Sequence, residues 1–193
     1  MISRLQGVLL TRGVDRVEIE TGGGVVYEAE VPGTVLARLP TPGAVIELRT
    51  AYVVTETSAA LYGFLEASER TLFRRLLTAS GVGAKLALSM MSAFTVERLA
   101  RAIVEKDVAA LTQVSGIGKK TAERISLELA DKVSDLAIGT TIGRAEGNGV
   151  QEAVQALIAL GYSFGDADKA VRGVLEQGAH DTAEDLIRRA LAG

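Results

Sequence analysis

Two copies of one short pattern, 35 residues apart, constrain this chain more than any other feature of its sequence. Residues 80–87 read SGVGAKLA and residues 115–122 read SGIGKKTA, so both follow Ser-Gly-(Val/Ile)-Gly-x-Lys-x-Ala. Each copy joins the end of one run of helical apolar periodicity to the start of the next. The repeat therefore predicts two successive helix pairs, each connected by a tight glycine-rich hairpin.

The residue types in the repeat suit the binding of phosphate groups. Glycine accepts positive φ and leaves no side chain between backbone and ligand, so a hairpin can present main-chain N–H groups at a helix N-terminus. Val82 and Ile117 are expected to plug each hairpin into the core, and the following Lys85 and Lys120 can pair with phosphates as point charges. The pattern resembles the helix–hairpin–helix DNA-binding motif, which predicts binding that is independent of sequence and sensitive to salt.

Residues 1–64 are predicted to form a β domain. Partly alternating apolar and polar residues indicate half-buried strands, and glycine- and proline-rich turns separate them. A small OB-like Greek-key barrel accounts for five short strands in this length, although the pattern also permits a sandwich fragment or an SH3-like barrel. The expected strands are 2–11, 14–20, 24–31, 44–54 and 61–64, with a helical turn at 35–39.

Residues 65–133 change to helical periodicity and are predicted to form an all-α domain. Ser68, Thr95 and Asp107 are the expected N-caps. A glycine-rich segment, 134–149, predicts a flexible linker, and 150–193 predicts a three-helix bundle suited to docking. The expected helices are 69–78, 85–92, 96–105, 108–113, 119–132, 151–160, 164–177 and 182–192, with Ser163 and Asp181 as further caps.

Composition excludes several kinds of catalytic site. The 193 residues include no Cys and one His, which excludes disulfides, zinc ribbons and cysteine nucleophiles. The sequence also has no P-loop and no carboxylate cluster suited to a two-metal nuclease, so neither ATP hydrolysis nor DNA cleavage is expected, and no cofactor. Neither a signal peptide nor a transmembrane span is evident, which predicts a cytoplasmic protein with no membrane association.

The distribution of charge supports DNA binding by the central region. The net charge of −3 argues weakly against a nucleic-acid binder, but it is uneven along the chain. Residues 1–64 carry −2, residues 65–133 carry +3 and residues 134–193 carry −4. The positive share therefore coincides with the twin hairpins.

The order of these modules resembles the RuvA family, the bacterial Holliday-junction-binding proteins that work with the RuvB motor ATPase. Local strings agree, among them LYGF at 61–64, RTLF at 70–73, GIGKKTAER at 116–124 and ALGY at 159–162. The resemblance spans essentially the whole chain. It implies a homotetramer, one or two per junction, that holds a four-way junction open and square-planar and recruits a hexameric RuvB-type ATPase for branch migration. It also implies a junction-resolving nuclease as a further partner, and a place in recombination, repair and the SOS response.

The resemblance also assigns roles to particular residues. Glu56 corresponds to an acidic pin that typically reads Arg-Glu-Asp, whereas this chain has Thr55-Glu56-Thr57. Ala84 stands where the first hairpin often has Pro. The DNA-facing residues implied are Gly81, Gly83, Lys85, Gly116, Gly118, Lys119, Lys120 and Arg124. The partner-docking candidates, which are equally suited to the core, are Leu157, Leu160, Tyr162, Leu186 and Ile187.

Two other functions are compatible with parts of the pattern. A helix–hairpin–helix DNA glycosylase would need a catalytic Asp about twenty residues after Lys120, where this chain has AIG at 137–139, and a base-flipping pocket. A general DNA scaffold would bind single strands through the barrel, but four Tyr and four Phe offer little base stacking. Both are weaker than the junction-binding prediction.

Overall fold

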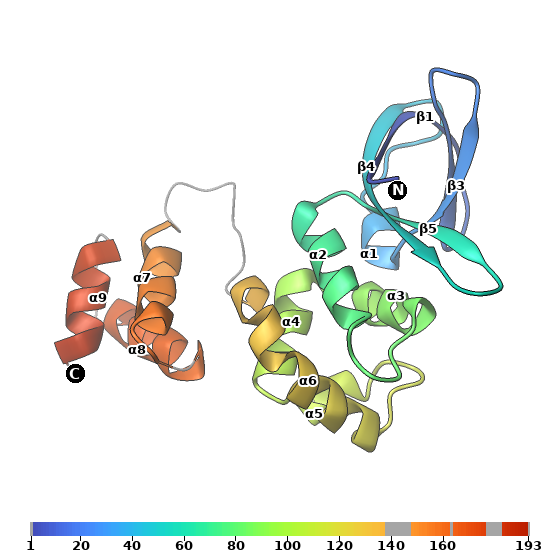
Figure 1. The fold of residues 1–193 in the computed structure, drawn as a ribbon. Helices are drawn as coiled ribbons and strands as arrows, with labels where there is room; N and C mark the ends of the chain where they lie inside the picture. The colour runs from blue at the N-terminus through green and yellow to red at the C-terminus, as the bar shows by residue number, and fades with distance from the viewer. Residues whose placement is uncertain (1, 138–147, 163, 177–182, 193) are drawn as a thin grey trace.

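The computed structural model of the chain describes residues 2–137, 148–162, 164–176 and 183–192. In these ranges a β-barrel is followed by a tandem helical domain and then by a group of helices, α7–α9 (Figure 1). The predicted fold class, an OB-like barrel followed by helix–hairpin–helix and C-terminal helical domains, is confirmed. Among the described residues, no helix combines the length and apolarity needed to cross a bilayer.

The barrel consists of β1 (Arg4–Arg12), β2 (Arg16–Glu20), β3 (Val26–Glu30), β4 (Val45–Val54) and β5 (Ala59–Phe64). It closes in the order β1-β2-β3-β5-β4, with antiparallel neighbours except for a parallel contact between β3 and β5. Alternate residues point inward, as period-2 patterning requires, and Leu9, Ile19 and Leu48 fill the interior. The short helix α1 (Gly33–Leu36) lies between β3 and β4 in the chain.

The helical domain comprises α2 (Ala67–Leu76), α3 (Ala84–Ala93), α4 (Val96–Val104), α5 (Val108–Leu111) and α6 (Lys119–Ala137). Two expected N-caps are confirmed: the Thr95 side chain accepts a hydrogen bond from the Arg98 amide, and the Asp107 side chain accepts one from the Ala110 amide. The expectation of Ser68 as a cap is wrong. The cap of α2 is Glu66, because Glu69 reaches back to the Glu66 amide and completes a capping box.

The interior of the barrel forms its own core, and residues of β4 and β5 join a second core that the barrel shares with the helical domain. Tyr62 and Phe64 of β5 pack on Phe73 of α2, with ring centroids 4.9 and 5.1 Å apart. Ala51 of β4 joins the same cluster, whose other buried members come from the helices and the two hairpins. The root of the β4–β5 hairpin is therefore held inside the helical core.

Helix α6 extends five residues beyond its predicted end at Lys132. Val133, Leu136 and Ala137 are buried and continue the apolar face of the helix, so residues 134–137 of the expected linker are helical. Residues 138–147, the rest of that linker before the next helix, lie outside the described residues, as do Ser163 and Asp181. Beyond them are α7 (Asn148–Ala159), α8 (Phe164–Glu176) and α9 (Ala183–Ala192).

Candidate nucleic-acid interface

The first hairpin connects α2 to α3 through a buried apolar plug. Gly81 has φ of +76°, a left-handed conformation that disfavours other residues, and Val82 turns inward and is buried. Gly83 is the N-cap of α3, and no side chain of the cap closes the helix start. The first-turn amides of α3 therefore lack the usual N-cap side-chain acceptor.

The second hairpin, before α6, repeats this geometry. Gly116 has φ of +92°, and Ile117 is buried. The plug amides make equivalent bonds: Val82 N–H donates to Ala79 O at 3.1 Å and Ile117 N–H donates to Val114 O at 3.0 Å. Two copies of one sequence pattern thus form two copies of one backbone structure.

The glycines within each hairpin have different roles, which the sequence interpretation did not separate. Only the first of each pair, Gly81 or Gly116, has positive φ. A Cβ built on Gly83 or Gly118 would meet no atom within 4 Å. The second glycine therefore leaves open space in front of a helix start, which is where an anion would approach.

The two hairpins brace each other. A Cβ on Gly81 would lie 2.6 Å from Nη2 of Arg124 on α6, and a Cβ on Gly116 would lie 3.4 Å from Cδ1 of Leu86 on α3. Each motif thus sends a side chain from its second helix onto the first glycine of the other motif. The two hairpins consequently lie in side-chain contact with each other.

Helix α6 also supports the first hairpin along one face. Glu128 accepts a hydrogen bond from the Ser80 amide at 2.8 Å, and Lys132 Nζ donates to Thr78 Oγ1 at 3.3 Å. Asp135 forms an ion pair with Arg75 at the end of α2. Charged residues at intervals of three to four along a helix hint at such a face, but the sequence alone does not say what it meets.

The predicted lysines lie on the surface around the hairpins. Lys85, Lys119, Lys120 and Arg124 are all exposed. A groove of about 560 Å³ is lined by Lys85 of α3, by Ser115 of the second hairpin and by Asp15 of the β1–β2 turn. The first motif's lysine therefore shares a groove with the second hairpin, an arrangement suited to two phosphates of one DNA backbone region.

The structure places Glu56 at the tip of the hairpin between β4 and β5. The hairpin projects from the barrel (Figure 1). Thr55 N–H donates to Ser58 O at 2.8 Å and closes the turn, and Glu56 is exposed. A carboxylate on a closed turn, anchored by strands that reach the helical core, has a defined position relative to the hairpins.

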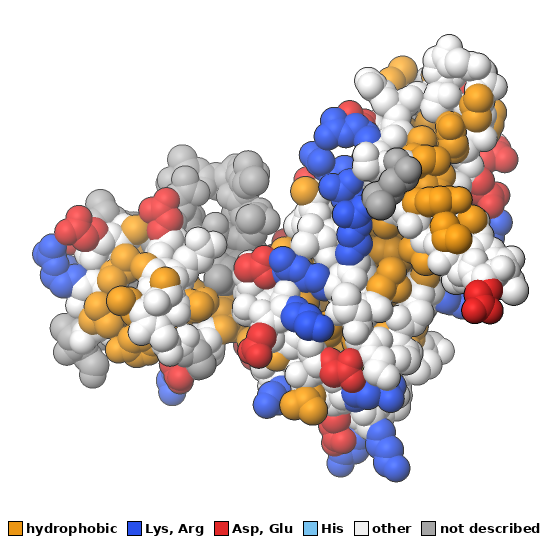
Figure 2. All heavy atoms as spheres, in the orientation of Figure 1, with side chains coloured by type: hydrophobic (Ala, Val, Ile, Leu, Met, Phe, Trp, Pro, Cys, Tyr) orange, Lys and Arg blue, Asp and Glu red, His pale blue; other side chains and the backbone are white. Residues whose placement is uncertain are grey.

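A second group of basic side chains, on the barrel and α2, was missed from the sequence. Arg4 and Arg49 are directly opposite each other on β1 and β4, a like-charge pair that strand pairing disfavours. Burial and the guanidinium groups of Arg74, Arg49 and Arg4 lower the pKa of Arg70. In Figure 2, Lys and Arg side chains (blue) gather along one edge of the barrel. Strand register is the signal that brings these residues together.

The five docking candidates in the C-terminal helices differ in exposure. Leu157 and Leu186 are 1% exposed and belong to the core, so the expectation that they face a partner is corrected, whereas Ile187 packs against that core and is only partly buried. Leu160 is 63% exposed and Tyr162 is 44% exposed. These two are the most exposed members of the set.

The described side chains offer an anion site but no metal site. No group of three His, Asp or Glu residues in the described ranges is placed to hold a metal ion. The chemistry available at the hairpins is hydrogen bonding from helix-start amides supplemented by lysine charge.

Comparisons with known proteins cover the whole chain. Family models match as follows: "RuvA N terminal domain" at residues 1–63, "SAM-like Helix-hairpin-helix tandem" at 73–131, and "RuvA, C-terminal domain" at 148–193. A protein of Gemmatimonas aurantiaca is 46% identical over 192 residues, covering 100% of this chain and 98% of that protein. One of Pseudomonas syringae is 41% identical over 203 residues, covering 100% and 99%.

Both relatives are named Holliday junction branch migration complex subunit RuvA. The barrel, the paired hairpins and the C-terminal helices occur here in the order in which the family models match. With identity above 40% over the full length of both proteins, the chain belongs to the RuvA family.

Proposed function

We propose that this protein binds four-way DNA junctions without sequence specificity, holds them open and square-planar as a tetramer, and recruits a RuvB-type ATPase for branch migration. It acts as the DNA-holding subunit and leaves ATP hydrolysis to the motor. Its place of action is the cytoplasm, in recombination and repair.

The observation that carries this proposal is the interlocked pair of hairpins. The start of α3 has no capping side chain, and the space in front of Gly83 and of Gly118 is open. Exposed lysines follow at Lys85, Lys119 and Lys120. Contacts of this kind neutralise phosphates and ignore bases, so they suit a protein that must slide along any sequence. Because the hairpins brace each other through Arg124 and Leu86, they can engage two phosphates at a constant spacing.

The acidic hairpin supports a role at the junction centre. In a four-fold tetramer, four copies of Glu56 would gather around the axis where the strands exchange. Their repulsion of phosphates would guide the strands apart into the arms. This chain has threonines on both sides of Glu56, so a single carboxylate per subunit performs that task.

The C-terminal helices support recruitment of the motor. Leu160 and Tyr162 form an exposed apolar pair, and a small module of this size binds through a few such anchors. Deleting residues 150–193 should preserve junction binding and abolish stimulation of the ATPase.

Binding assays with three DNA substrates test the DNA-binding part of the proposal. Fluorescence anisotropy should show tighter binding to a four-way junction than to linear duplex or single strand, and equal affinities would contradict the proposal. Lys119→Glu with Lys120→Glu should weaken junction binding sharply and reduce the salt slope by about 1.8 for each subunit of the tetramer that contacts the DNA, since two phosphate contacts per subunit are lost. Arg98→Glu with Arg188→Glu makes the same charge change away from the hairpins and is the matched control.

The oligomeric state is tested by mass measurement with and without a junction. A tetramer alone, and one or two tetramers on the junction, would agree with the proposal. A monomer bound to the junction would refute the four-fold arrangement.

A further inference from the structure

The short helix α1 joins the barrel to both helices that flank the first hairpin. It lies in the barrel sequence between β3 and β4, yet it contacts α3 directly (Figure 1). Gly33 and Thr34 of α1, and Arg38 just after the helix, make the polar contacts with α3 and α2. We refer to them together as the α1 clamp.

The first arm of the α1 clamp holds the far end of α3. Thr34 Oγ1 donates to the main-chain oxygen of Met91 at 2.8 Å, and the Gly33 amide donates to Ser92 Oγ at 2.9 Å. The Met91 carbonyl is in the last turn of α3, where it has no intrahelical partner. The N-terminus of the same helix has Gly83 as its N-cap. In the proposed function, this is the end of the helix that meets phosphate.

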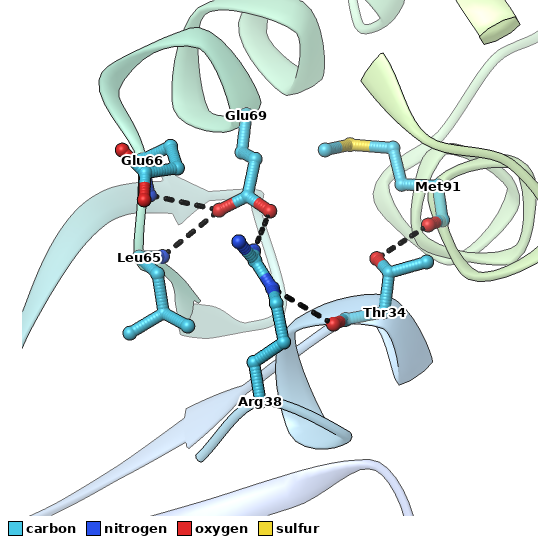
Figure 3. Close-up of polar contacts among 6 residues, drawn as sticks. All are labelled: Thr34, Arg38, Leu65, Glu66, Glu69 and Met91. Atoms are coloured by element: carbon cyan, nitrogen blue, oxygen red, sulfur yellow. Dashed lines mark hydrogen bonds and ion pairs between the residues drawn. The ribbon is translucent and has the colours of Figure 1, made fainter. Parts of the chain in front are cut away.

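The second arm holds the far end of α2. Arg38 forms an ion pair with Glu69, and its Nε donates to Thr34 O at 3.2 Å (Figure 3). Glu69 is only 6% exposed, and it also accepts the amides of Leu65 and Glu66 at 3.0 and 2.8 Å. One carboxylate thus links α1, the start of α2 and the residues that leave β5.

Polar bonds hold this boundary together with the close approach of Gly33 to Ser92. A cavity of about 330 Å³ lies beside them, lined by Thr34, Arg38, Glu69, Met91 and further side chains of α2–α4. The shared core around Phe73 fixes the other attachment of the barrel. Loss of the α1 clamp would therefore leave the barrel attached at one side, through the core around Phe73 and the bond from Arg70 Nη1 to Ser3 O, and the two domains could rock about that side.

We infer that the α1 clamp, with Arg38 as its main positioning residue, fixes the first hairpin relative to the acidic hairpin at Glu56. The two helices that form the first hairpin are both gripped at their distant ends by α1, which belongs to the barrel that carries Glu56. The clamp therefore determines where phosphates are held relative to where the carboxylate repels them. This inference rests on the proposed function, because it concerns the precision of junction opening.

Distances between two labels test the inference directly. The chain contains no Cys, so Thr57→Cys at the acidic hairpin and Ser80→Cys at the first hairpin would carry the only two spin labels. Mixing with excess unlabelled chain limits the signal to distances within one subunit. The labelled parent should give a narrow distribution, and Arg38→Ala with Thr34→Val should broaden it.

Junction selectivity is the functional measurement. Removing the ion pair and one hydrogen bond should weaken junction binding by about three- to tenfold, while affinity for linear duplex, which needs only the hairpins, changes less than twofold. Arg38→Lys keeps the charge but cannot bond both Thr34 and Glu69 as a guanidinium does, so it should restore selectivity only in part. Arg188→Ala, which removes an exposed ion pair to Glu184 within α9, is the matched control and should behave as wild type in DNA binding.

The outcomes separate the inference from the proposed function. An unchanged distance distribution together with unchanged selectivity in the Arg38 and Thr34 variant would overturn the clamp. Equal loss of duplex and junction binding would also overturn it, because that result indicates general damage to the hairpins. A wild-type protein without junction preference would instead refute the proposed function, and the label distances would still decide whether α1 holds the two domains.

Discussion

Replacing the two glycines of the first hairpin one at a time should separate folding from DNA binding. At residue 81 the backbone has φ of +76°, which costs about 1–2 kcal/mol for an L-residue other than glycine. A Cβ there would also lie 2.6 Å from Nη2 of Arg124, although that group is the end of a flexible side chain and can move. Gly81→Ala should therefore lower the free energy of unfolding by about 1–2 kcal/mol.

Residue 83 should behave differently. Its φ of −85° is ordinary, and a Cβ would meet nothing within 4 Å, so Gly83→Ala should cost only about 0.5 kcal/mol, as a poorer N-cap. The new methyl group would stand in the open space before α3. Junction affinity should fall about tenfold, comparable to the loss of one hydrogen bond to a charged group.

Urea denaturation followed by far-UV circular dichroism measures the first effect, because the chain has no Trp for fluorescence. Anisotropy with a labelled junction measures the second. Gly83→Ala protein that binds with wild-type affinity would refute the assignment of that space to phosphate. Equal destabilisation by the two substitutions would refute the distinction between the two glycines.

Three further predictions concern the core around Phe73, the contact of Glu128 with the first hairpin, and Glu56 on the acidic hairpin. Phe73→Ala should lower the free energy of unfolding by about 3–5 kcal/mol, because Phe73 is fully buried against Tyr62 and Phe64; a loss below 1 kcal/mol in urea denaturation would contradict the shared core. Glu128→Gln keeps an acceptor for the Ser80 amide but removes a negative charge beside the first hairpin. Junction affinity should therefore rise about two- to threefold at low salt and less at high salt. A decrease in affinity would argue against this electrostatic role. Glu56→Gln should leave duplex affinity unchanged but reduce the opening of the junction centre, measured by fluorescence of 2-aminopurine at the crossover; unchanged emission would exclude the pin.

The hairpins were predictable from sequence because their chemistry is local. A left-handed residue, an apolar plug and an open helix start lie within four positions, so the pattern of glycines and Val82 or Ile117 specifies them. The N-caps Thr95 and Asp107 were predictable for the same reason, because each side chain accepts a hydrogen bond from the amide only three residues later. The β-barrel was predictable in class from strand periodicity, and its closure order came from the structure.

The predictions that were wrong have two different causes. For Ser68 the competing signal is local: Ser68 is a good cap by type, but Glu69 accepts the amide of Glu66, three residues before it, and starts the helix earlier. Helix α6 continues to Ala137 because three further apolar residues find a core to pack against. Leu157 and Leu186 could not be assigned to core or surface, since helical periodicity shows which face is apolar and not what covers it.

The local pattern of this chain therefore determines two glycine hairpins, each with a buried Val82 or Ile117, and the class of the barrel. Tertiary structure decides how these parts are placed: Arg124 against Gly81, Glu128 against the first hairpin, and Arg38 against Glu69 across the domain boundary. Each of these contacts joins residues at least 31 positions apart. Their pairing depends on how helices and strands pack in three dimensions, a property that no short window of sequence contains.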